Sequence, residues 1–197
     1  NVAILDSWRE TVGNTVFIAN GTNDQTITSA GGGISNLRMD KPSGALSVTG
    51  GLRVSTLLLS SGIYSNISGS LTVMNLTRDP GAMFFPNQGT VYFDTPNWGS
   101  TTVNVGTQEF YRVSMLGRRG GRISLSGGKL IVFNDLTITP TDIYGGDSTQ
   151  ISSGGFEVYG NLYVGTWARG GNATLSFVGP NVQTFALEAG GYLLRSL

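Results

Sequence analysis

Short runs along the chain repeat one hydrophobic pattern: two apolar residues separated by a single position, followed a few residues later by another such pair. In one stretch the pairs are Leu46 with Val48, Leu52 with Val54, and Leu57 with Leu59. Because side chains alternate in direction along a β-strand, both members of a pair lie on the same face of a short strand. The pattern therefore predicts many short strands, each with one apolar face turned inward.

The pairs return further along the chain as part of a longer repeat. The later pairs are Ile123 with Leu125, Leu130 with Val132, and Leu136 with Ile138. Similar segments, Thr-Val-Phe-Ile, Thr-Val-Tyr-Phe and Thr-Leu-Ser-Phe, begin at Thr15, Thr90 and Thr174. We therefore expect long repeats at about 15–89, 90–173 and 174–197, the last of them truncated.

The spacing of the pairs predicts how the strands are connected. A new pair follows after about six residues, often across Gly-Gly or Ser-Gly. This spacing is too tight for a meander of ordinary hairpins, but it suits a chain that bends the same way at every corner, with glycines supplying positive φ. We expect an all-β, parallel β-helix (β-solenoid) over 1–197 as a single domain. Its coils would hold roughly 18 to 25 residues, three or four coils per long repeat.

An antiparallel β-sandwich is the alternative fold. Short alternating strands with frequent turn signals are expected there too. A sandwich does not explain why the apolar pairs recur about every six residues and again at a long period, so the solenoid is favoured.

Composition narrows the possible functions. Charged residues make up 12 % of the chain, the 12 basic and 12 acidic residues cancel, and both cysteine and histidine are absent. The charge balance argues against nucleic acid as a partner, and no apolar stretch approaches the roughly 20 residues that span a bilayer. Without cysteine or histidine there is no disulfide, thiolate or imidazole metal site, or histidine-based triad. We expect no cofactor and no metal.

The order of these residues resembles long repetitive bacterial or prokaryotic cell-surface proteins that are predicted to be right-handed β-helices, of the adhesin or extracellular matrix type. The matching segments are Asn20-Gly21, Gln25-Thr26-Ile27, Asn36-Leu37-Arg38-Met39, Lys41, Gly44-Ala45-Leu46, Gly51-Leu52-Arg53-Val54 and Leu57 to Gly62. The resemblance covers nearly the whole chain. It implies a β-helix in an extracellular setting, and it departs at 100–103 and at 116–122.

Clustered carboxylates raise the alternative of a polysaccharide-active enzyme, since β-helices also carry such sites. The candidates are Asp135, Asp142, Asp147 and Glu157. At β-helix corners, however, Asp usually bonds nearby backbone amides and holds the bend. The segment 144–150 resembles one fragment of a calcium-binding loop without its tandem copies, and a turn is the better interpretation. We expect no catalytic residues and no enzyme activity.

A second set of residues could contact glycans or a protein partner. These are Trp98, Trp167, Arg118, Arg119 and Arg122. Indole rings stack on sugars and arginines bind acidic groups, although packing at the core edge and exposure on a turn explain the same residues. Sequons allow N-glycosylation at Asn20, Asn66, Asn75 and Asn172.

The fold expectation leads to a functional one. A solenoid coil buries its interior only where another coil covers it. The third repeat copy is short, so we expect further coils of the same polypeptide, or other copies of the chain, to cover the ends. We therefore expect a non-catalytic structural segment of an extracellular, cell-surface fibre. The alternatives are an adhesin that binds cell-surface glycans and, third, the polysaccharide-active enzyme.

Overall fold

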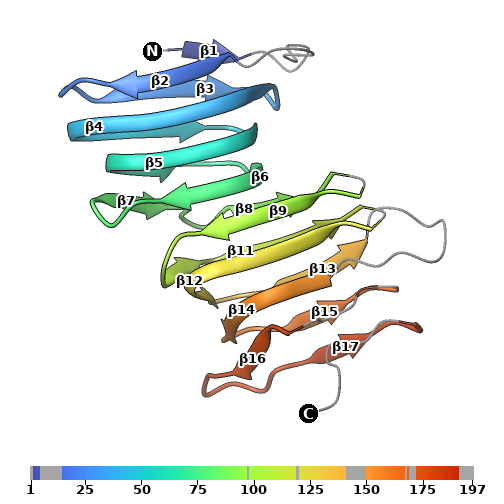
Figure 1. The fold of residues 1–197 in the computed structure, drawn as a ribbon. Helices are drawn as coiled ribbons and strands as arrows, with labels where there is room; N and C mark the ends of the chain where they lie inside the picture. The colour runs from blue at the N-terminus through green and yellow to red at the C-terminus, as the bar shows by residue number, and fades with distance from the viewer. Residues whose placement is uncertain are drawn as a thin grey trace. The chain divides into compact units, whose positions relative to one another are not determined.

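The computed structural model describes residues 2–4, 15–96, 98–118, 120–140, 150–166, 168 and 172–190. Within these residues there is no helix, and parallel strands stack as a β-solenoid of about seven turns (Figure 1). The predicted fold class is confirmed. The chain divides into two compact units, Asn1–Val91 and Tyr92–Leu197, and the division falls inside the strand that opens the second predicted repeat. The single domain over 1–197 stays a prediction.

Unit 1 is a stack of coils whose strands pair in parallel. Its strands are β1 (Val2–Ile4), β2 (Val16–Asn20), β3 (Gln25–Ser29), β4 (Gly33–Thr49), β5 (Leu52–Asn66), β6 (Leu71–Arg78) and β7 (Ala82–Phe85), with β8 (Thr90–Asp94) at the boundary. Strands β2 and β3 both pair with β4, which pairs with β5. Strand β5 pairs in turn with β6 and β7.

Unit 2 repeats this arrangement. Its strands are β9 (Ser100–Asn104), β10 (Gln108–Phe110), β11 (Arg112–Gly117), β12 (Arg122–Val132), β13 (Leu136–Pro140), β14 (Gln150–Val158), β15 (Leu162–Val164), β16 (Thr174–Phe177) and β17 (Phe185–Leu187). Strands β9 and β10 pair with β12, and β12 pairs with β14, which pairs with β16. Strand β11 pairs with β13, β13 with β15, and β15 with β17.

The pairings give the length of each coil. In unit 1, Ala45 lies opposite Ile63, 18 positions on, and Gln25 lies opposite Leu46, 21 positions on. These values confirm the predicted coil length. Unit 2 is less regular, because Arg122 lies opposite Gln150, 28 positions on. This longer coil includes 141–149, which lie outside the described residues.

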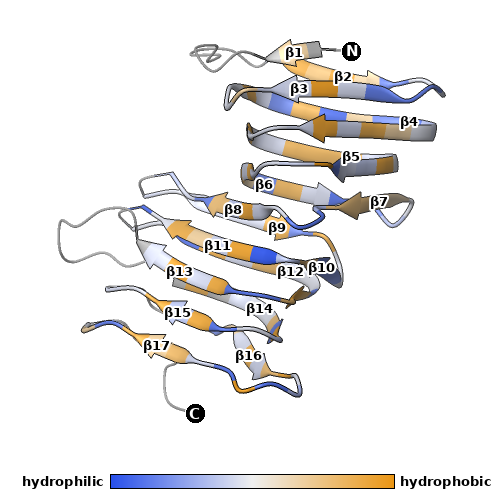
Figure 2. Ribbon diagram, turned by 180° about the vertical axis from the view of Figure 1, so that it is seen from behind, coloured by the Kyte–Doolittle hydropathy of each residue, from blue (hydrophilic) through white to orange (hydrophobic). Residues whose placement is uncertain are grey.

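The predicted apolar pairs form the core. All twelve residues of the six pairs named from the sequence are at most 3 % exposed. They stack in columns from coil to coil, such as Leu37, Leu57 and Leu76 in unit 1 and Val113, Leu136 and Leu162 in unit 2. In Figure 2 apolar positions recur on successive strands. Because these pairs stack on parallel strands, the antiparallel sandwich is excluded for the described part of the chain.

Glycine allows neighbouring coils to approach at one corner of unit 1. Gly50 has φ +83°, and a Cβ added there would lie 1.8 Å from the carbonyl oxygen of Ser29 on the preceding coil. Gly69, at the next coil, has φ +81° and would place a Cβ 2.4 Å from the carbonyl carbon of Gly50. The sequence prediction that corner glycines supply positive φ is confirmed at both positions.

The opening strands of the three repeat copies differ in which face they bury. Val91 and Phe93 of β8 are buried, and Phe177 of β16 stacks on buried Val158. In β2 the face is reversed: Val16 and Ile18 are exposed, whereas Ala19 is buried. A shift of one residue turns every side chain of a strand to the opposite face. Similar residues at equivalent positions of the three repeat copies therefore do not all face the core.

Candidate interaction surfaces

Two tight turns stack on one corner of unit 2. In the first, the Gly99 amide donates to the Pro96 carbonyl at 3.1 Å; in the second, the Gly121 amide donates to the Arg118 carbonyl at 2.7 Å. The strands that follow are in register, since Ser100 lies opposite Arg122, 22 positions on. The two turns therefore occupy equivalent places in successive coils. We call them together the Trp98 corner, by which we mean the described residues 96, 98, 99, 118 and 120–122.

Trp98 stands at the third position of the first turn. Its backbone has φ +56°, a left-handed conformation that usually falls to Gly or Asn, and its side chain is 66 % exposed. The equivalent position of the second turn is Gly120, with φ +64°. A Cβ on Gly120 would lie 2.4 Å from Cε3 of the Trp98 indole. The indole therefore rests on the bare backbone of Gly120, and a residue with a side chain there would displace it.

Arg118 is held by the protein itself. Its Nε and Nη2 donate to Oδ1 and Oδ2 of Asp94 at 3.0 and 2.8 Å, and its backbone amide donates to Oγ1 of Thr95 at 2.9 Å. The hydrogen bonds and charge of Asp94 raise the pKa of the Arg118 guanidinium above its ordinary value. Such a two-point pair fixes geometry as well as charge. Arg118 is thus a structural cation whose charge Asp94 largely compensates.

The structure brings together three of the five predicted contact residues. Trp98, Arg118 and Arg122 all lie at the Trp98 corner, where Arg122 is exposed. Trp167 and Arg119 lie outside the described residues. Sequence reasoning found these positions but not their contacts, because it could not show that the turns at 96–99 and 118–121 are one coil apart.

The four sequon asparagines differ in exposure. Asn20 and Asn172 are exposed, and Asn75 is half-buried. Asn66 is buried, and its Nδ2 donates to the Gly69 carbonyl at 3.2 Å. Glycan attachment at Asn66 would therefore have to precede folding, whereas Asn20 and Asn172 are accessible in the folded chain.

Two of the four candidate carboxylates lie within the described residues, and each bonds to a cation on a neighbouring coil. Oδ2 of Asp135 lies 3.7 Å from Nε of Arg112, and Oδ1 of Asp135 accepts from Nδ2 of Asn161 at 3.1 Å. Glu157 is ion-paired with Lys129. Asp142 and Asp147 lie outside the described residues. The contacts of Asp135 and Glu157 thus connect successive coils, and the absence of enzyme activity stays a prediction.

A polar group missed by sequence reasoning lies inside unit 1. Lys41 is fully buried, and its Nζ donates to the carbonyls of Gly21 and Asn23 at 3.3 and 2.7 Å and to Oε1 of Gln25 at 3.1 Å. The ammonium group thus satisfies backbone acceptors of the turn between β2 and β3. A single lysine among apolar pairs gave no sign of this role, because lysine is normally exposed.

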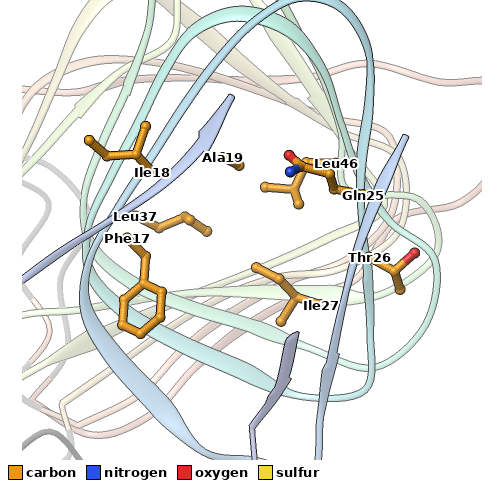
Figure 3. A pocket seen from close by; sticks show the side chains of 8 residues that line it. All are labelled: Phe17, Ile18, Ala19, Gln25, Thr26, Ile27, Leu37 and Leu46. Atoms are coloured by element: carbon orange, nitrogen blue, oxygen red, sulfur yellow. The ribbon is translucent and has the colours of Figure 1, made fainter. Parts of the chain in front are cut away.

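An apolar pocket opens at the β2 and β3 end of unit 1. Its lining residues are Phe17, Ile18, Ala19, Gln25, Thr26, Ile27, Leu37 and Leu46. In Figure 3 the side chains of Phe17, Ile27, Leu37 and Leu46 point toward the middle of the coil, and that of Thr26 points away. This pocket is therefore lined largely by inward residues of the coils that hold β2, β3 and β4, and β1 pairs with β3 at the same end, with Val2 opposite Ile27.

The last described coil of unit 2 has inward positions that are half exposed. Phe185 and Leu187 of β17 are each 49 % exposed, although they stack on Leu162 and Val164 of β15, which are buried. On β16, Phe177 is 43 % exposed and stacks on buried Val158. The column that is dry in the interior of unit 2 is thus open to water at this end.

Comparisons of the chain with protein-family models, with curated proteins and with solved structures gave no match. Among the described residues no helix is long and apolar enough to cross a membrane. The class defined by the fold is that of β-solenoid repeat proteins.

Proposed function

We propose that this chain is a non-catalytic structural segment of an extracellular, cell-surface fibre, and that its coils continue into coils of another copy or of the same polypeptide. The observation that carries the proposal is the change in exposure along one column. Leu136 and Leu162 are buried, and Phe185, the next residue of that column, is half exposed. A covering coil would remove this apolar surface from water.

The energetics favour coverage of the end coil. Burial of one large apolar side chain contributes about 1.5–3 kcal/mol. Phe177, Phe185 and Leu187 each have roughly half of that still to gain. Stacking by parallel strands would also pair the backbone groups of an uncovered edge, which otherwise invite association with another chain. Extension along the column is therefore the mode of assembly that the coil geometry supports.

The surface setting is supported by the sequence resemblance to repetitive cell-surface proteins and by the low charge of the chain. A shaft of this type needs regular stacking and has no requirement for a reactive group. The contacts that Asp135 and Glu157 make with Arg112 and Lys129 on neighbouring coils suit that role.

A charge placed in the open column tests the proposal. Leu187→Asp and Phe185→Asp should reduce association of the chain in sedimentation velocity, because a carboxylate would have to be buried against a partner coil. Val182→Asp is the matched control. Val182 is 99 % exposed, so this substitution adds the same charge near the same coil without placing it in the column. Circular dichroism verifies that each variant is folded. Equal association of all three variants and the unaltered chain would contradict assembly through this end.

A further inference from the structure

We infer that the turn between β16 and β17 binds the ammonium group of a lysine that is supplied by the coil covering this end of unit 2. This site rests on the proposed function, since it is complete only when a coil covers β16 and β17. In unit 1 the equivalent turn already holds a lysine from the coil that follows it. The third repeat copy presents acceptors of the same kind on the last described coil.

In unit 1 the lysine and the covering strand arrive together. Lys41 belongs to β4, which pairs with β2 before this residue and with β3 after it. Its Nζ donates to the carbonyls of Gly21 and Asn23 and to Oε1 of Gln25, and the side chain is fully buried. A buried cation needs such partners, and a turn needs donors for its carbonyls. The turn between β2 and β3 is therefore complete only with the lysine of the next coil.

The turn between β16 and β17 repeats this arrangement. Gly179, Asn181 and Gln183 each lie 158 positions after the residue of the same type in the turn of unit 1. The glycine has positive φ in both turns. The same offset relates two inward residues, Ile27 of β3 and Phe185 of β17. The two turns are therefore equivalent in structure as well as in sequence.

Gln183 uses only the nitrogen of its amide within the described residues. Its Nε2 donates to the carbonyls of Val158 and Gly160 at 2.7 and 2.8 Å, so the nitrogen holds the preceding coil. In unit 1 the amide oxygen of the equivalent Gln25 accepts from Lys41 at 3.1 Å. The oxygen of Gln183 is thus the acceptor that remains for a donor from the next coil.

The second repeat copy follows the same rule with different residues. Its opening strand β8 ends at Asp94, and Arg118, on the next coil, donates to both carboxylate oxygens of Asp94 at 3.0 and 2.8 Å. In both copies a cation from the following coil thus binds where the opening strand ends. The third turn offers two carbonyls and an amide oxygen, as the first does, and the three N–H groups of an ammonium match these acceptors.

The occupant is a strand of the β4 type, with a lysine between two segments that pair with β16 and β17. Lys41 and Lys129 are the two lysines of the chain. Lys41 is buried in unit 1, and Lys129 is ion-paired with Glu157. A folded second copy could therefore cover the apolar column, but it would leave these acceptors without a lysine. A coil that brings its own lysine fills the column and the turn together.

The test is fluorescence anisotropy of a labelled peptide with the sequence of β4, residues 33–49, titrated with the whole chain at concentrations where sedimentation shows a monomer. We expect this peptide to bind with a Kd below about 1 mM. Lys41→Met in the peptide should weaken binding about tenfold or more, because the charge-assisted hydrogen bonds are lost. Arg38→Met in the peptide is the matched control. It removes the same charge from a side chain that is exposed in unit 1, so the Kd should change by less than about twofold.

A variant of the chain checks where the peptide binds. In unit 1 Ile27 lies opposite Val48 of β4, so Phe185 should face Val48 of the peptide. Phe185→Asp in the chain should therefore abolish binding of the β4 peptide. The two peptide substitutions leave the chain unaltered, so its folding is the same in each titration.

The inference is overturned if the Lys41→Met peptide binds as well as the β4 peptide, since this end would then accept any apolar coil, including that of a second copy. It is also overturned if Arg38→Met weakens binding as much as Lys41→Met, if the β4 peptide does not bind below about 1 mM, or if Phe185→Asp leaves its binding unchanged. None of these results decides the fibre proposal, which is tested separately by the association of the chain.

Discussion

Lys41 and Tyr64 are both buried inside unit 1, and their hydrogen bonding differs. Lys41 donates to three acceptors of one turn, so its burial is compensated. Tyr64 is fully buried, and its ring packs against that of Phe84 at a centroid distance of 5.3 Å. Its hydroxyl has no hydrogen-bond partner within the described residues. Burial accordingly raises the pKa of Tyr64. A buried hydroxyl of this kind costs stability.

Tyr64→Phe should therefore raise the free energy of unfolding by about 1 kcal/mol, since it removes an unsatisfied hydroxyl and keeps the ring in the column. Urea unfolding followed by circular dichroism measures the change. Tyr159→Phe is the control: Tyr159 is exposed and should show little effect. A loss of stability in Tyr64→Phe would mean that the hydroxyl has a bonding partner in the core.

At the scale of the element, one carboxylate fastens the last described coil of unit 2. Glu188, directly after β17, accepts from the Tyr163 hydroxyl and, through Oε2, from the backbone amide and Oγ1 of Thr166 at 2.9 and 2.8 Å. The hydrogen bond from Tyr163, followed by those from Thr166, lowers the pKa of Glu188 below its ordinary value of 4.5. The coil that contains β17 is thus tied to β15 by a carboxylate whose ionised form these hydrogen bonds favour.

Because folding lowers the pKa of Glu188, the last described coil should become less stable as the pH falls. A carboxylate whose pKa is lowered by folding stabilises the fold above the unfolded pKa, and this contribution disappears as the pH falls through the folded value. As the pH falls below the ordinary glutamate pKa of 4.5, the amides of Leu162 and Glu188, which donate to the carbonyls of Thr184 and Val164, should lose protection, so that their exchange rates move closer to the intrinsic rates. Glu188→Gln should show this lower protection of the two amides already at pH 7, with little further change on acidification. Pronounced pH dependence that persists in Glu188→Gln would assign the effect to another group.

The sequence predicted the column of inward apolar residues. It did not predict every contact between neighbouring coils that positions the side chains outside that column. Pairs such as Leu57 with Leu59 were placed correctly because alternation along a strand is a local property. The buried face of β2 and the contact of Trp98 with Gly120 depend on register between coils. Register shifts by one residue when a turn changes length, and a single sequence does not show where those changes fall.

At the scale of the whole molecule, the account depends on one claim: where no further coil of its own polypeptide covers it, the last described coil is covered by a coil of another copy. Electron micrographs of the folded, unaltered chain at increasing concentration test it most directly. The account predicts linear filaments that lengthen with concentration, together with loss of those filaments in Leu187→Asp and their persistence in Val182→Asp. Discrete particles of monomer size at every concentration would contradict it.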